Sequence, residues 1–245
     1  MNVRDILRRM IFMNALLTID WDYFMPYVCY FNLSYLENKR NIDKHWYRLY
    51  LENKQCGIDI TKRMVVGREK NNFWTNIKNF FNMDNIDRVI VSDSHKIAYD
   101  LAKATKCEEV YNFDSHTDLG YGGLESLNYE VNCANWLGKL LNEGIVGRAS
   151  IILSPYTGER KEYFDEINKK FDISYKRINE LKSRVLVNTL HICRSGAWTA
   201  PWLDHEFDEF IRHLNKKIEY KEYMKREWNV NDITLADKIE YLLFS

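Results

Sequence analysis

The chain has 245 residues, of which 46% are hydrophobic and 29% are charged, as is usual for a globular protein. Lys plus Arg and Asp plus Glu number 35 each, so no overall basic field would draw the protein to nucleic acid or to an anionic membrane surface. A local basic patch is left open, but we expect no nucleic-acid partner. No stretch approaches the roughly 20 apolar residues that a membrane span needs, so we also expect no membrane location.

The amino terminus carries Arg8 and Arg9 before a short apolar run, which is a feature of signal peptides. That run reaches Asp20 and Asp22 without a small-residue cleavage site, so we do not expect export. The five cysteines are odd in number and scattered, with no CxxC pair, which argues against a disulfide framework or a zinc knuckle. We expect reduced thiols in a cytoplasmic protein.

Five short apolar runs predict strands, and they are separated by segments with helical spacing. The predicted strands are residues 14–19, 87–92, 109–113, 149–153 and 185–193. Apolar residues near the 3.6-residue period predict helices within 72–81, 97–102 and 136–141, and Gly144 marks the end of the last one. Strands that alternate with helices predict an α/β fold with a mostly parallel sheet, in a three-layer α/β/α arrangement.

Two segments fit this alternation less well. Residues 27–70 are aromatic and charged without a clear period, and we interpret them as an insertion or a lid. Residues 204–245 are expected to be helical, because Phe207, Phe210, Ile211 and Leu214 form an apolar stripe. With three prolines, ten glycines and no linker-like tract, residues 1–245 are predicted to form a single domain.

The run 109–113 leads into Asp114, His116 and Asp118. Side chains at positions i, i+2 and i+4 of an extended segment project from one face, so two carboxylates and one imidazole can converge on one point. This convergence is typical of metal ligands. The other interpretation is a polar strand end with capping carboxylates.

Two more predicted strands end in groups of the same kind. The first strand ends in Asp20 and Asp22, and the second is followed by His95. In a parallel sheet the carboxyl ends of the strands meet at one edge, where sites for ligands form. His95 could instead face solvent at the start of a helix that Asp93 or Ser94 caps.

Four Asp and two His form a set of ligands suited to two divalent ions. Buried carboxylates cost several kcal/mol each unless they are paired or bound to a cation. An oxygen-rich set favours Mn²⁺ over Zn²⁺, since structural zinc sites favour thiolate and imidazole, although Zn²⁺ or Fe²⁺ remain alternatives.

These residues resemble the metal-binding motifs of the arginase/deacetylase superfamily, the ureohydrolases in particular. That family carries Asp-x-His-x-Asp after one strand, matched by 114–118, and a His that closes a strand upstream, matched by His95. Its Ser-x-Asp-x-Asp-x-x-Asp-Pro motif is similar to residues 18–26, with Met25 in place of the third Asp. In this chain the second motif precedes the first, so the resemblance implies a permuted order of the strands.

The resemblance implies an arginase/deacetylase-like fold and a defined distribution of the ligands. Asp114 and Asp20 would bridge two Mn²⁺ ions. His95 and Asp118 would complete one site, and His116 and Asp22 the other.

Three residues outside the metal motifs are candidates for binding substrate. Asn132 and Asn135 follow a glycine-containing loop, residues 119–123, that could approach a substrate closely. A turn followed by an N-capped helix is the other interpretation. Arg194 could clamp a carboxylate or phosphate, or it could neutralise the acidic cluster from outside.

Other aromatic and imidazole side chains have less specific interpretations. His191, His205 and His45 could serve as proton shuttles, although each also fits an ordinary surface or core histidine. For Trp198 and Trp202 we expect packing in the core rather than in a pocket wall.

The sequence therefore predicts a binuclear metal-dependent hydrolase that cleaves a C–N bond of an amide, guanidine or amidine with a metal-bridging hydroxide. Asp118, Asp114 and Asp20 would be catalytic, with Asp118 orienting the hydroxide. One alternative is a calcineurin-like metallophosphoesterase, suggested by residues 92–95. Another is a catalytically silent arginase-like binding module. The expected partner is a small-molecule substrate, and assembly into a homo-oligomer is left open.

Overall fold

A computed structural model of the protein describes residues 14–26, 42–181 and 185–244. Eight strands in this part of the chain pair side by side, and every pairing between them is parallel. The strands are β1 (Ala15–Asp20), β2 (Phe81–Asn82), β3 (Arg88–Ser92), β4 (Glu109–Asp114), β5 (Arg148–Leu153), β6 (Ile173–Lys176), β7 (Val185–Cys193) and β8 (Glu219–Lys221).

The order across the sheet is β6-β5-β4-β1-β7-β3-β8, and β2 pairs with β7 beside β3. All five predicted strands are confirmed, within one residue at each end. The sequence analysis missed β2, β6 and β8, which have two to four residues each. Runs this short carry too little periodicity to be recognised.

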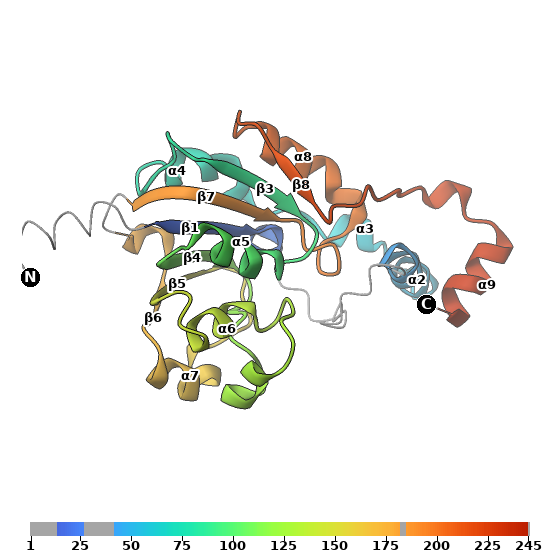
Figure 1. Ribbon diagram of the computed structural model, residues 1–245. Coiled ribbons are helices and arrows are strands. Elements are labelled where there is room, and N and C mark those ends of the chain that lie inside the picture. Colours follow the sequence, from blue (N-terminus) through green and yellow to red (C-terminus); the bar gives the residue numbers. More distant parts are fainter. Residues whose placement is uncertain (1–13, 27–41, 182–184, 245) are drawn as a thin grey trace, which may run out of the picture.

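Helices cover the sheet on both faces (Figure 1). The α-helices are α2 (Ile42–Gln55), α3 (Ile60–Arg63), α4 (Phe73–Ile77), α5 (Ile97–Thr105), α6 (Trp136–Asn142), α7 (Asp165–Lys170), α8 (Asp204–Arg212) and α9 (Leu235–Phe244). The 3-10 helices are η1 (Trp21–Phe24), η2 (Arg68–Asn72), η3 (Gly123–Asn128), η4 (Lys161–Phe164), η5 (Ile178–Glu180), η6 (Pro201–Leu203) and η7 (Val230–Asp232).

Alternate residues of the central strands belong to two separate hydrophobic clusters. Leu17 and Ile19 of β1 pack in one cluster with side chains of α4 and α8. Leu16 packs in the other with α5, α6 and α7. A strand covered on both faces becomes apolar at nearly every position, which is why residues 15–19 read as an almost unbroken apolar run.

The helix predicted around residues 72–81 is shorter than expected. The α-helix ends at Ile77, and Phe81 begins β2. Phe81 is buried against Tyr111 and Phe113 of the sheet, so its apolar character reflects strand packing rather than a helical stripe. The helix end predicted at Gly144 is confirmed, because Glu143 closes α6 and Gly144 has φ = +67°.

The expectation that residues 204–245 are helical is wrong in the middle of this segment. Between α8 and α9 lies β8, which extends the sheet beside β3. An exposed ion pair between Arg88 and Glu219 joins the two strands. The three residues of β8 have no hydrophobic alternation, since they lie at the edge of the sheet.

Part of the segment interpreted as an insertion or lid also has a regular structure. Residues 27–41 lie outside the described residues. From Ile42 onward the chain forms α2, which packs against α9, and Tyr50, Leu51 and Ile60 form a small cluster of their own with residues near the carboxyl end (Figure 1). None of the described helices is both long and apolar enough to cross a lipid bilayer.

Candidate metal centre

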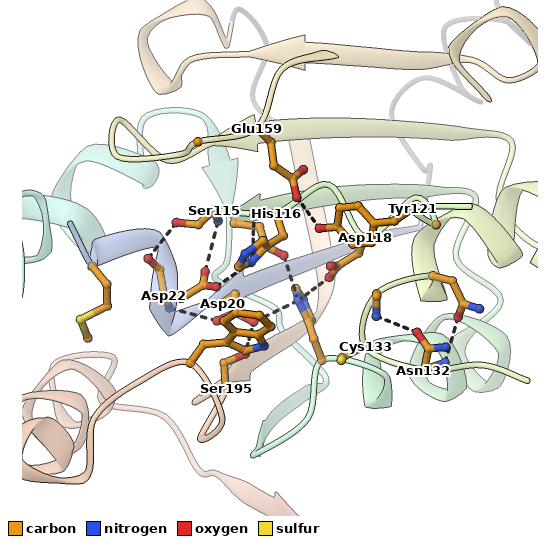
Figure 2. A pocket seen from close by; sticks show the side chains of 18 of the residues that line it. Asp20, Asp22, Ser115, His116, Asp118, Tyr121, Asn132, Cys133, Glu159 and Ser195 are labelled. Atoms are coloured by element: carbon orange, nitrogen blue, oxygen red, sulfur yellow. Dashed lines mark hydrogen bonds and ion pairs between the residues drawn. The ribbon is translucent and has the colours of Figure 1, made fainter. Parts of the chain in front are cut away.

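The six predicted metal ligands lie together at the carboxyl ends of the central strands. Asp20 ends β1 and caps η1, while Asp22 lies within η1. Asp114 ends β4, and His116 and Asp118 follow it. Since β1 and β4 are parallel neighbours, their ends meet at the same edge of the sheet. The side chains of Asp20, Asp22, His116 and Asp118 turn toward a common region (Figure 2).

The first group of predicted ligands surrounds the imidazole of His95, in the short connection between β3 and α5. Its Nδ1 atom lies 3.0 Å from Oδ2 of Asp114, 3.0 Å from Oδ2 of Asp118 and 3.2 Å from Oδ2 of Asp20. His95 is 1% exposed, so the alternative in which it faces solvent at a capped helix start is wrong.

The second group lies on the other side of Asp114. Nδ1 of His116 is 2.8 Å from Oδ2 of Asp22 and 3.7 Å from Oδ1 of Asp114. One oxygen of Asp114 thus belongs to the first group and the other to the second. Asp20, His95 and Asp114 form one cluster that could hold a cation, and Asp22, Asp114 and His116 form another.

Burial and mutual repulsion shift the pKa values of the carboxyl groups in this site strongly. Burial raises the pKa of Asp22 well above its usual range, and the charges of Asp20 and Asp114 raise it further. Burial together with the charge of Asp114 raises the pKa of Asp118 to about 8. Contacts with both imidazoles outweigh burial at Asp114 and hold its pKa far below the usual range.

The imidazoles respond in the opposite direction. Burial alone would lower the pKa of His95, but contacts with Asp114, Asp118 and Asp20 outweigh it and raise this pKa. The pKa of His116 is also raised, because Asp22 and Asp114 outweigh the effect of burial. Several carboxylates therefore compete for positive charge from two imidazoles.

The contacts around His95 fit a cation better than they fit hydrogen bonds. Three carboxylate oxygens approach one nitrogen atom, although an imidazole nitrogen has at most one proton to donate. None of these contacts has the alignment of a hydrogen bond, so Nδ1 of His95 is a buried polar atom without a partner. A divalent ion among these donors would satisfy all of them at once.

Neighbouring residues hold two of the carboxylates in place. The indole N–H of Trp136 donates to Oδ2 of Asp118 at 2.6 Å, and the hydroxyl of Ser195 donates to Oδ2 of Asp20. Asp118 and Ser195 both have positive φ, +53° and +52°, a conformation that is strained for residues other than glycine. Such strain persists where the surrounding structure fixes it, and it is frequent at functional sites.

All six predicted ligands line a pocket of about 760 Å³. Its wall combines apolar and aromatic side chains with small residues of the loop that follows Asp118. No Lys or Arg of the described residues lines it. Residues of the wall other than the ligands include Met25, Pro26, Met64, Ser115, Gly120, Tyr121, Gly122, Ser126, Tyr129, Asn132, Cys133, Asn135, Glu159, Ser195 and Trp198.

A fifth carboxylate in this pocket belongs to Glu159, in the connection that follows β5. Glu159 accepts hydrogen bonds from the backbone N–H of Thr117, at 2.8 Å, and from the hydroxyl of Tyr121. Figure 2 shows Glu159 and Tyr121 together beside His116. Burial raises the pKa of Glu159, while the charge of His116 opposes that rise.

The loop predicted to approach a substrate lies in the pocket wall. Gly120 has φ = +98°, and a Cβ atom there would come within 2.3 Å of Ser126 Oγ, so glycine is required at this turn. Asn132 and Asn135 also line the pocket. The side chain of Asn135 accepts from Asn132 N and donates to two backbone carbonyls, so it shapes the loop instead of capping α6.

Arg194 does not lie where a substrate-binding residue would be needed. Its guanidinium group is buried outside the pocket wall and bonds to Asp93 and Asp204, at 2.6 and 2.9 Å. It also contacts Tyr223 and the carbonyl oxygen of Met224. Arg194 therefore joins β7 to the carboxyl-terminal segment, and it neither clamps a pocket ligand nor touches the ligand carboxylates.

The remaining histidines and tryptophans have distinct positions. His205 and His45 lie on α8 and α2 and do not line the pocket, whereas His191 is fully buried in β7. Trp202 packs against Trp46, as expected for a core residue. The expectation for Trp198 was wrong, because it lines the pocket and its ring lies tilted against that of His116, with ring centroids 5.0 Å apart.

Sequence reasoning missed Glu159 and Ser195 as parts of this site, and it placed Tyr121 there only as a member of the 119–123 loop. Each belongs to a loop without periodicity, and its place depends on how loops after different strands meet. The positive φ of Ser195 left no signal, because serine is not a residue type that predicts this conformation. A polar residue soon after a strand end was the available hint, and it is a weak one.

No protein family, curated protein or solved structure matches the chain.

Proposed function

We propose that the protein is a binuclear metal-dependent hydrolase of the arginase-like type, acting on a C–N bond other than a peptide bond. The observation that carries this proposal is the position of Asp114, whose two oxygens face two different histidine-containing groups. A carboxylate shared in this way is how two ions a few ångströms apart are held. The three-layer arginase/deacetylase arrangement and a cytoplasmic location belong to the same proposal.

The donor set supports two divalent ions such as Mn²⁺. Asp20, Asp114, Asp118 and His95 would hold one, and Asp22, His116 and the second oxygen of Asp114 the other. The proposal does not include the bridging role expected for Asp20, because its Oδ1 accepts from the backbone N–H of Asp22 and only its Oδ2 faces His95. Carboxylate oxygens outnumber imidazoles and no cysteine is among the donors, which favours Mn²⁺ over Zn²⁺. Ions bound here would lower the pKa of water and polarise a carbonyl or amidine carbon, which makes hydrolysis near neutral pH feasible.

Residues of the pocket would orient the attacking water molecule and bind the substrate. Asp118 lines the pocket and is fixed by Trp136, so it can orient an attacking water molecule. Glu159 presents an acceptor toward the pocket, which suits a substrate with N–H donors or a positive charge. The apolar wall with Trp198 and Met64 suits the carbon skeleton of a small molecule.

The phosphoesterase alternative has less support. It needs Asp93 and His95 as a pair of ligands, but the carboxylate of Asp93 bonds to Arg194 and to the backbone N–H of Met224. The described pocket wall also lacks a Lys or Arg for a phosphate dianion and carries Glu159 instead. A silent binding module would not need two ligand groups that share one carboxylate beneath an open pocket.

Metal analysis of protein purified without chelator tests the proposal. We expect two Mn²⁺ ions per chain after reconstitution, and turnover of at least one compound in a panel of amides, guanidines and amidines. Chelation should abolish this turnover, and Mn²⁺ should restore it. Nitrophenyl phosphate, assayed in parallel, should not be hydrolysed. Fewer than two ions per chain would contradict the binuclear centre, and hydrolysis of the phosphate alone would support the phosphoesterase.

A further inference from the structure

A chain of buried hydrogen bonds runs from the back of His95 into the sheet. Nε2 of His95 lies 2.8 Å from Oγ1 of Thr18, which lies 3.0 Å from Nδ1 of His191. Nε2 of His191 lies 2.8 Å from Oγ of Ser92, and this hydroxyl donates to the carbonyl oxygen of Ser94 at 2.9 Å. Thr18, His191 and Ser92 lie in β1, β7 and β3, which are adjacent strands.

The direction of every bond in this chain follows from its last member. The carbonyl oxygen of Ser94 can only accept, so it takes the single hydroxyl proton of Ser92. Ser92 must then accept from Nε2–H of His191, and a neutral His191 must accept at Nδ1. Thr18 donates its proton to that atom and accepts from Nε2–H of His95.

The surroundings of His191 keep this direction fixed. The side chain is fully buried, and no carboxylate contacts it among the described residues. Each ring nitrogen of His191 faces one hydroxyl group, so the buried ring has no anion to stabilise a charge and is held as the neutral form. A neutral ring with Nε2–H fits both neighbours, because Ser92 accepts from Nε2–H and Thr18 donates to Nδ1.

We infer that Ser92, His191 and Thr18 are positioning residues that hold the Nε2–H of His95 toward Thr18 and direct its Nδ1 atom at Asp114, Asp118 and Asp20, where a metal ion would replace the Nδ1 proton. This inference rests on the proposed function, because it assigns the three residues to the binding of a metal ion by His95. Ligand histidines are commonly oriented by a hydrogen bond at the other ring nitrogen, and loss of such a partner costs about 10- to 100-fold in metal affinity. Here the partner is Thr18, which is itself held by His191 and Ser92 in two further strands, and we call these three hydrogen-bonded residues the relay.

Thr18 offers the sharpest test, because a matched pair of variants separates its hydroxyl from its shape. Thr18→Val is nearly isosteric and leaves His95 and His191 without their shared partner, whereas Thr18→Ser keeps the hydroxyl. We expect Thr18→Val to weaken Mn²⁺ binding, measured by calorimetry, about 10- to 100-fold, and Thr18→Ser to bind within about 3-fold of the wild type. Melting temperatures of all proteins are recorded to exclude unfolding.

Ser92→Ala tests the far end of the relay. Ser150→Ala is its control, since Ser150 is also buried in the sheet, in β5, and its hydroxyl bonds to Ser174 away from the site. Ser92→Ala should weaken Mn²⁺ binding several-fold, and Ser150→Ala should not. If both variants bind Mn²⁺ with the affinity of the wild type, Ser92 is not part of the relay.

A spectroscopic measurement tests the relay independently of metal binding. Two-bond ¹H–¹⁵N correlation spectra of metal-free wild-type protein should show His191 as the neutral form with Nε2–H, and a form with Nδ1–H would overturn the inference. If this form is seen but Thr18→Val binds Mn²⁺ as the wild type does, the positioning role fails while the proposed function stands. If wild-type protein binds no Mn²⁺, the proposed function fails first, and the role assigned to the relay fails with it.

Discussion

Nδ1 of His95 and Oδ2 of Asp114 lie 3.0 Å apart, although the strands nearest to them in the chain, β3 and β4, are not neighbours in the sheet. His95 comes after β3 and Asp114 ends β4, and β7 and β1 lie between these two strands. The connection after β3 therefore brings His95 back across the end of the sheet. Because of this path, Asp114 contacts one imidazole from a distant strand and a second, His116, from its own.

Because Asp114 faces both groups, we expect Asp114→Asn and Asp22→Asn to lose different numbers of Mn²⁺ ions. Asp114→Asn should reduce the Mn²⁺ content from two ions to none, since both groups lose a negative ligand. Asp22→Asn should leave one ion, held by the group around His95. Elemental analysis after dialysis measures the content, and turnover should fall more than about 100-fold in both variants, because even the loss of an outer partner costs about 10- to 100-fold.

Asp172→Asn is the control for these two variants, because Asp172 pairs with Arg148 at the exposed edge of the sheet. It should bind two ions as the wild type does. A wild-type Mn²⁺ content in Asp114→Asn would remove the basis for a shared carboxylate.

The indole of Trp136 should matter to the site through its N–H group. Trp136→Phe keeps an aromatic ring on α6 but removes the donor to Asp118. We expect Mn²⁺ affinity to fall about 10-fold, with a small loss of stability from the smaller ring. Leu140→Met, in the same helix and equally buried, is the control for altered packing. Equal affinities for Trp136→Phe and the wild type would show that Asp118 needs no such donor.

The strained backbone of Ser195 predicts that two substitutions weaken Mn²⁺ binding equally but differ in stability. Ser195→Ala and Ser195→Gly both remove the hydroxyl that bonds to Asp20, so both should bind Mn²⁺ about 10-fold more weakly. Glycine adopts φ = +52° without strain, whereas alanine does not. Thermal unfolding should therefore show Ser195→Gly to be about 1 kcal/mol more stable than Ser195→Ala. The reverse order would contradict the strain.

The metal-free protein should lose stability as the pH rises from about 6 to about 9. The pKa of His95 is raised in the folded state, so its contribution is fully present below the unfolded pKa of about 6.5 and is lost as the pH passes the folded pKa. The pKa of Asp118 is raised to about 8, so ionisation in the folded state costs more free energy as the pH rises toward that value. Both groups act in the same direction.

Thermal unfolding in chelator at pH 6 and at pH 9 measures this dependence, and we expect a decrease on the order of 5 °C. Saturating Mn²⁺ should reverse the trend, because metal binding requires deprotonated ligands and strengthens as the pH rises. A metal-free melting temperature that increases over this range would argue against the raised pKa values.

Glu159 should affect the substrate rather than the metal. Glu159→Gln keeps the size of the side chain and an acceptor for Thr117 N, but removes the negative charge. The Mn²⁺ content should stay at two, while KM for guanidine and amidine substrates should rise about 10-fold or more, with less change for neutral amides. Glu166→Gln is the control, since Glu166 contacts the backbone of Leu124 outside the pocket wall. Equal effects on cationic and neutral substrates would contradict this role.

Local patterns were enough to predict much of the fold. The runs that became β1, β3, β4, β5 and β7 are apolar at nearly every position, because helices cover both faces of the sheet. The alternation of strands and helices in the sequence also fixed the parallel class. The short strands β2, β6 and β8 escaped prediction, since two to four residues form a strand only where a neighbouring strand offers its backbone.

In the candidate site, too, local patterns predicted some residues, and the tertiary structure was needed for others. Asp114, His116 and Asp118 were recognisable together because a period of two within one extended segment places them on one face. Nothing local shows that Asp93 and Arg194 pair with each other outside the pocket, that Glu159 enters it, or that His191 stands behind His95.

The sequence by itself determined which residue types stand at the ends of the main strands, because neighbours along the chain set the period and polarity of each segment. Only the tertiary structure decided which carboxylate is shared and which imidazole faces it. Those contacts depend on the order of strands in the sheet and on the paths of the loops, and both are set by packing between residues far apart in the chain.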